Sequence, residues 1–70
     1  MQNRYKIVLI DNLSRDTREQ VVEAKDVYEA HKHAYFKLAQ STEEVESITD
    51  VDTEQQVYGE AEGFLEEQLF

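Results

Sequence analysis

Acidic side chains recur at nearly every second position of residues 43–55, EEVESITDVDTEQ. Successive side chains of a β-strand point to opposite faces, so a strand in this segment would gather its acids on one face. That face would carry Glu44, Glu46, Asp50, Asp52 and Glu54, interrupted only by Ile48. Carboxylates gathered in this way can bind a metal ion, exchange protons with a substrate, or take the place of phosphate groups.

Metal binding lacks the rest of its sequence motif. Asp50, Asp52 and Glu54 match the first, third and fifth positions of a calcium-binding loop. Such a loop needs glycine at its sixth position and glutamate at its twelfth, where this chain has glutamine and alanine. His31 and His33 lie two residues apart, which turns them roughly 200° from each other on a helix. We therefore expect neither a metal site nor a cofactor.

We also expect no enzymatic activity. Paired carboxylates carry out acid–base chemistry when burial separates their pKa values, whereas the acids of this chain belong to an open surface. The chain has no cysteine, and its two glycines, Gly59 and Gly63, do not form a phosphate-binding loop. Its serines lie in turn-like or surface contexts, so the sequence offers no evident nucleophile.

Phosphate mimicry fits the spacing of the acidic face. Same-face residues of a strand are about 6.6–6.8 Å apart, and phosphates of one DNA strand are spaced by roughly 3.4 Å of axial rise along a longer backbone path. A row of carboxylates on a strand therefore approximates a row of phosphates in spacing and in sign. Four further glutamates would extend the row, namely Glu60, Glu62, Glu66 and Glu67.

The distribution of charge indicates the kind of partner. The 70 residues carry a net charge of −9, and all seven Lys and Arg residues precede residue 43. Residues 43–70 contain ten acids and no Lys or Arg. Such a segment repels nucleic acid and favours a basic partner. The alternative is an acidic face that only keeps a small protein soluble, although mixed charges would serve that purpose with less repulsion.

The sequence predicts a single α+β domain, with an antiparallel sheet of about three strands and one main helix packed on it in the order β-β-α-β. Alternation predicts strands at 4–11 and 17–24, joined as a hairpin, and a third strand at 44–54. Residues 25–40 show helical spacing, with Val27, Ala30 and Ala34 on one arc. A short C-terminal helix is expected at 60–69.

No apolar run is long enough for a membrane span, and we expect a cytoplasmic protein.

Two phenylalanines suggest a contact between copies of the chain. Phe36 falls opposite the apolar arc of the expected main helix, and Phe70 is the last residue. Because a 70-residue chain buries only a thin core, we expect a homodimer with Phe36 and Phe70 as candidate contacts. The same features support an alternative function, a protein-interaction or regulatory module that binds through an apolar patch around Phe36 and the C-terminal helix.

In size, acidity, lack of cysteine and hairpin–helix–strand pattern, the chain resembles the small host-takeover proteins of bacteriophages that mimic DNA. Within that group it is most similar to inhibitors of the bacterial nucleoid protein HU. The resemblance covers the character of the whole chain and includes no diagnostic motif. It implies that the acidic residues occupy the DNA site of a basic host protein such as HU, in the host cytoplasm, without contacting nucleic acid.

Overall fold

The apolar segment near the N-terminus forms the strand that the rest of the sheet is built on. In the computed structural model, which describes residues 2–65, β1 (Asn3–Asp11) buries Tyr5, Ile7 and Leu9 at 0–2% exposure. Its alternation of buried and accessible side chains is that of a strand with one face on the core. β1 pairs in antiparallel fashion with β2 (Thr17–Ala24) on one side and with β3 (Glu43–Asp50) on the other.

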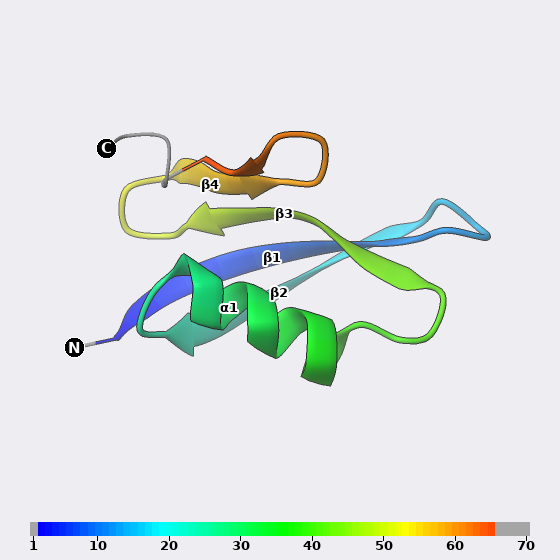
Figure 1. Ribbon diagram of the computed structural model, residues 1–70, viewed down its shortest axis with the longest axis horizontal. Helices are drawn as coiled ribbons and strands as arrows, with labels where there is room; N and C mark the ends of the chain where they lie inside the picture. Colours follow the sequence, from blue (N-terminus) through cyan, green and yellow to red (C-terminus); the bar gives the residue numbers. More distant parts are fainter. Residues whose placement is uncertain (1, 66–70) are drawn as a thin grey trace.

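Over the described residues, the sheet has five strands in the order β2-β1-β3-β4-β5, all antiparallel (Figure 1). β4 (Gln55–Gly59) and β5 (Gly63–Phe64) follow β3. The prediction of about three strands with a main helix in the order β-β-α-β is therefore wrong, because the chain adds two strands after the third. The additional strands extend the sheet on the side away from β2.

A turn inside the predicted third strand explains the error. Strand β3 ends at Asp50, where one carboxylate oxygen accepts hydrogen bonds from the backbone N–H groups of Asp52 (2.9 Å) and Thr53 (3.3 Å). Aspartate favours turns because its side chain can bond the backbone two residues on. Glu54 completes the reversal with a φ of 58°, and its N–H donates to the Asp50 carbonyl. The alternating acids at 50–54 thus form a turn rather than a continuation of the strand.

The helix is shorter than the predicted 25–40. α1 spans Val27–His33 and continues as one π-helical segment, η1, over Ala34–Leu38. Asp26 caps the start by accepting a hydrogen bond from the Glu29 N–H at 2.9 Å, which removes one unpaired donor of the first turn. At the other end the Ala39 N–H bonds the Ala34 carbonyl, and extended dihedral angles at Ala39 end the helix.

The predicted C-terminal helix at 60–69 is absent from the part that the structure describes. Residues 60–62 form a turn, and Gly63 takes a φ of +77°, a conformation that glycine adopts without steric cost. Gly63 and Phe64 then pair with β4. The remainder of the prediction, residues 66–69, lies outside the described residues.

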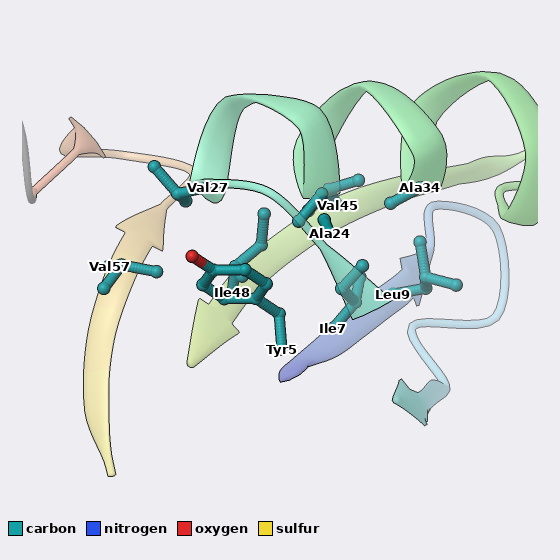
Figure 2. Close-up of a cluster of buried hydrophobic side chains, with 10 residues drawn as sticks. Tyr5, Ile7, Leu9, Ala24, Val27, Ala34, Val45, Ile48 and Val57 are labelled. Atoms are coloured by element: carbon teal, nitrogen blue, oxygen red, sulfur yellow. The ribbon is translucent and has the colours of Figure 1, made fainter. Parts of the chain in front are cut away.

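The core lies between the sheet and the helix. Figure 2 shows side chains of β1, β3 and β4 converging beneath the helix, where small alanines let the helix approach the sheet. The buried set includes Tyr5, Ile7, Leu9, Ala24, Val27, Ala30, Ala34, Val45, Ile48 and Val57. Within residues 2–65, no helix is long and apolar enough to cross a membrane.

A β-bulge changes which residues of β3 face the core. Val8 lies opposite Ser47, but Leu9 lies opposite Val45, so Glu46 is an extra residue in β3. As a result, Val45 (4% exposed) and Ile48 (0%) both face the helix although they are three residues apart. The predicted acidic face with Ile48 as its interruption is therefore wrong, because strict alternation does not hold across the bulge.

Replacing Ile48 by alanine tests this placement. Because Ile48 is fully buried, Ile48→Ala should lower the free energy of unfolding by about 2–5 kcal/mol. The matched control is Leu13→Ala, since Leu13 is 81% exposed in the hairpin turn and should change stability little. Urea unfolding followed by circular dichroism measures both, and equal effects of the two variants would contradict the placement.

Candidate partner-binding site

The acids of the predicted row fall into two groups at opposite ends of β3. Glu44 and Glu46 lie in the first half of the strand, whereas Asp50 is its last residue, and Asp52 and Glu54 lie in the turn beyond. Glu44 and Asp50 lie opposite Ile10 and Tyr5 of β1, and these five steps of strand correspond to roughly 17 Å at 3.3 Å per residue. The structure therefore divides the predicted continuous row, and the first group is joined by acids from another segment.

The first group, which we term the acidic cluster, consists of Glu44, Glu46, Glu60 and Glu62. Antiparallel pairing of β3 with β4 brings the turn after β4 back to the first half of β3. The Glu60 N–H donates to the Glu46 carbonyl at 2.9 Å, and the Glu62 N–H donates to the Gly59 carbonyl at 2.9 Å. Backbone hydrogen bonds thus hold the two segments of the cluster together.

A surface depression runs through the acidic cluster. Its lining includes Glu46, Glu60 and Glu62, together with Ser47, Gln56, Gly59 and Ala61. Gly59 is buried, and a Cβ atom at this position would lie 2.6 Å from the Gln56 side-chain nitrogen. A larger residue at 59 would therefore displace Gln56. The depression combines carboxylates with neutral amide and hydroxyl groups.

Like charges meet at close range in the acidic cluster. The Glu44 carboxylate, through a hydrogen bond and charge repulsion, raises the pKa of Glu60, with smaller contributions from desolvation and Glu46. Arg15 acts weakly in the opposite direction. Burial, together with the charges of Glu60 and Glu44, also raises the pKa of the Tyr58 hydroxyl. The cluster is therefore a local excess of negative charge that a cation would relieve.

The second group has structural roles. The Asp50 side chain fixes the turn, as described above, and Asp52 forms an ion pair with Arg4 at 3.2 Å between two exposed side chains. Glu54 is exposed and occupies the left-handed backbone position of the turn. The second group therefore forms a turn that is separate from the acidic cluster, and one of its acids, Asp52, is neutralised by Arg4.

One further acid is neutralised by a residue far away in the sequence. Arg18 on β2 donates from Nε and one terminal nitrogen to the two carboxylate oxygens of Glu43, at 2.8 and 2.9 Å. These bonds, with a further one from the Gln40 N–H, lower the pKa of Glu43 to about 2. The absence of Lys and Arg after residue 42 therefore does not leave every acid unpaired, because β2 and β1 supply Arg18 and Arg4.

An aromatic cluster that the sequence did not lead us to expect lies beside β4 and β5. His31 of the helix lies 4.6 Å from Tyr58 and 5.2 Å from Phe64 between ring centroids, and Tyr28 lies 4.6 Å from Phe64. Burial among these rings lowers the pKa of His31. The spacing of Tyr28, His31 and Tyr35 on one helical flank was a usable signal, but the sheet pairing that brings Tyr58 and Phe64 beside the helix was not predicted.

The two candidate dimer contacts have different outcomes. Phe36 is 68% exposed on the helix, whereas Phe70 lies outside the described residues, as do Glu66 and Glu67 of the predicted binding set.

In the described part of the chain, no group of three or more His, Cys, Asp or Glu side chains is arranged to hold a metal ion.

Comparison with known proteins gives no relative. No protein-family model matches the sequence, and neither a curated protein nor a solved structure matches it significantly.

The Arg18–Glu43 pair predicts a specific pH dependence of stability. Because the folded-state pKa of Glu43 is about 2, below its ordinary 4.5, the pair stabilises the fold above pH 4.5 and this contribution is lost as the pH falls toward 2. Glu43→Gln should flatten this part of the stability profile. Urea midpoints measured between these pH values test it, with Glu23→Gln on exposed β2 as the control that should retain the wild-type slope.

The raised pKa of Glu60 predicts a pH dependence of stability opposite in sign to that of Glu43. The raised pKa means that the Glu60 carboxyl releases its proton less readily in the folded protein, so its contribution to stability falls as the pH rises through the region just above 4.5. Glu44→Gln removes the principal cause and should lower the pKa of Glu60. Carbon-13 NMR titration of the glutamate carboxyl groups measures this change, and an unaltered Glu60 titration in the variant would contradict the cluster geometry.

Proposed function

We propose that this protein binds the basic DNA-binding surface of another protein through its acidic cluster and thereby blocks DNA binding. The observation that carries the proposal is the like-charge interaction of Glu44 and Glu60, reinforced by Glu46, beside a surface depression that Glu46, Glu60 and Glu62 line. Within the described residues, Glu44, Glu46, Glu60 and Glu62 are members of no ion pair. The fold thus maintains a concentration of carboxylates that its own basic residues do not neutralise.

A cationic surface that binds DNA would gain from contact with this cluster. Such surfaces obtain much of their affinity by neutralising phosphates. The backbone that carries these carboxylates is already fixed by the sheet and its turn, so binding has only the side chains left to order. The repulsion among the glutamates is already present in the free protein, so a Lys or Arg of the partner would relieve it on binding. This gain is absent when the acids are widely spaced on a surface.

The division of the acids into two groups suits a partner with more than one phosphate site. The acidic cluster and the turn at Asp50–Glu54 are roughly 17 Å apart along β3, which corresponds to about five phosphates of axial rise on one DNA strand. A partner that contacts both groups would use them as two separate phosphate substitutes. Asp52 would contribute less than the cluster, because Arg4 already neutralises part of its charge.

The resemblance to phage DNA mimics suggests HU of a host bacterium as the first partner to test. HU fits the chemistry required, because it binds DNA through basic surfaces with little dependence on base sequence. The proposed location is then the cytoplasm, with the protein held at the nucleoid through its partner. The proposal includes neither direct contact with nucleic acid nor catalysis.

The alternative, an interaction module that uses an apolar patch, is favoured by the exposure of Phe36 (68%) and the neighbouring Tyr35 (60%). Its second expected component, a helix over 60–69, is contradicted for the residues that the structure describes. The two functions separate experimentally, because Phe36→Ala should impair binding by an apolar patch and leave binding by the acidic cluster intact.

A competition experiment tests the proposal. Labelled duplex DNA bound to HU should be displaced by the wild-type protein, with an affinity that falls steeply as salt rises because ionic contacts dominate. The triple variant Glu44→Gln, Glu46→Gln and Glu60→Gln should lose at least about tenfold in inhibition, which corresponds to about 1.4 kcal/mol. Fluorescence anisotropy of the DNA measures both.

The matched control removes the same number of acids elsewhere. Asp16→Asn, Glu23→Gln and Glu29→Gln lie on the hairpin turn, β2 and α1, and all three side chains are exposed. Glu29→Gln keeps a side-chain oxygen that can accept the hydrogen bond from the Lys25 N–H. This triple variant has the same net charge as the cluster variant and should inhibit nearly as well as the wild type. Equal loss in both variants would show that net charge, rather than the cluster, determines binding, and a salt-insensitive complex would contradict the electrostatic mechanism.

A further inference from the structure

Among residues 2–65, one edge of the sheet is a long strand that pairs on one side only. β2 is the terminal strand of the sheet and pairs over eight residues with β1, in a register without a bulge. The opposite edge is β5, which has two residues. An exposed regular edge strand presents unpaired backbone groups and can pair with another strand.

The register identifies which backbone groups point outward. The Asp11 N–H donates to the Asp16 carbonyl at 2.8 Å, in register with the β1–β2 pairs. Because hydrogen-bonded and non-hydrogen-bonded pairs alternate in an antiparallel ladder, Arg18, Gln20 and Val22 bond to β1. The N–H and C=O groups of Glu19, Val21 and Glu23 therefore point away from the sheet. The Arg4 carbonyl is consistent with this pattern, because it accepts from the Val51 N–H and not from Glu23, its β2 neighbour.

We propose that two copies of the chain form a two-fold dimer by antiparallel pairing of their β2 edges, which creates one ten-stranded sheet. A two-fold axis perpendicular to the sheet keeps each side-chain face on the same side in both copies. Residues that lie opposite each other in the two copies must then both have odd numbers or both have even numbers. The axis must therefore pass beside a residue of β2, and few registers meet this requirement. The proposal does not depend on the function of the acidic cluster.

Charge selects among these registers. Centring the axis on Val21 would place Glu19 opposite Glu23 of the second copy, twice, and like charges opposite each other are destabilising. Centring it on Gln20 would place Glu19 opposite Val21 and Glu23 opposite Thr17, which avoids this repulsion but pairs no opposite charges. Centring it on Val22 places Glu19 opposite Lys25 of the second copy and Glu23 opposite Val21. In this register Val21 and Glu23 exchange backbone hydrogen bonds with Glu23 and Val21 of the second copy, and the partly buried Val22, which packs on the core, meets its own copy.

The helix lies on the side that this dimer would cover. Its Tyr28 and His31 contact Phe64 and Tyr58 toward β4 and β5, so its opposite flank faces the β2 side, where Arg18 donates to the Leu38 carbonyl at 2.7 Å. His33 and Lys37 lie on that flank, and a groove lined by Glu29, Lys32, His33, Phe36 and Lys37 extends from it onto the outer side of the helix. The exposed Phe36 thus belongs to a surface next to the proposed axis.

One axis can serve both the strands and the helices. Figure 1 shows α1 running back alongside β2 after a short connection. Val22 is about 7 Å along the strand from Ala24, and His33 is about 9 Å along the helix from Val27. The flanks of two helices can therefore meet around His33, in antiparallel orientation, with Glu29 of one copy toward Lys37 of the other. Pairing of the edges and closure of this groove would occur together.

Sedimentation equilibrium and amide hydrogen exchange test the proposal on the full chain. We expect the mass of two chains, and slow exchange of the Val21 and Glu23 N–H groups that becomes faster on dilution. Val21→Pro removes an outward N–H and none of the bonds to β1, a position where an edge strand tolerates proline, so it should give a folded monomer. Val21→Thr keeps the N–H and should remain a dimer.

A charge exchange provides a second test that does not depend on proline. Lys25→Glu should weaken the dimer at least about tenfold, because it places a glutamate opposite Glu19. Glu19 is also the ion-pair partner of Lys6 at 3.7 Å, so addition of Glu19→Lys together with Lys6→Gln, which avoids two adjacent lysines, should restore the dimer. A monomeric wild-type protein, rapid exchange of Val21 and Glu23 in the dimer, or a dimer that both Val21→Pro and Lys25→Glu leave unchanged would overturn the proposal.

Discussion

The pairing of β3 with two neighbours is the constraint on which the rest of the structure depends. Its ladder with β1 contains the bulge at Glu46, and its ladder with β4 shifts register between Ile48 and Thr49. The first shift brings both Val45 and Ile48 into the core, and the second accommodates the buried Val57. The pairing of β3 with β4 also brings Glu60 next to Glu46, where the Glu60 N–H donates to the Glu46 carbonyl. Core packing and the acidic cluster therefore follow from one strand.

The core and the charged surface are balanced against each other. Folding concentrates the glutamates of β3 and of the turn after β4, which raises the pKa of Glu60 and opposes stability at neutral pH. Burial of Ile7, Leu9 and Ile48 offsets this repulsion, and the Arg18–Glu43 ion pair ties β2 to the start of β3. A surface that only needed to be soluble could avoid the repulsion by interspersing basic residues. Maintaining the cluster is more readily explained by a cationic partner.

The sequence predicts the first half of the fold better than the second. Strong alternation in residues 4–11 and helical spacing around Val27, Ala30 and Ala34 indicate local structure that packing then reinforces. The third strand was predicted too long because acids and β-branched residues continue to alternate through Asp50–Glu54. There the Asp50 carboxylate accepts backbone hydrogen bonds and stabilises a turn. A bulge leaves no pattern in a single sequence. The positions of Glu44 and Glu46 could be identified as acidic, but their contact with Glu60 depends on the unpredicted β4. The partners of Glu43 and Asp52 are contributed by arginines far away in the sequence.

The most direct test of the central claim follows the Glu60 carboxyl itself. Its pKa can be measured by carbon-13 NMR in the free protein and in the presence of saturating HU. If a basic surface occupies the acidic cluster, the pKa of Glu60 must fall on binding, because a nearby cation stabilises the carboxylate and outweighs the repulsion from Glu44. An inhibitory complex in which the Glu60 titration is unchanged would contradict the account.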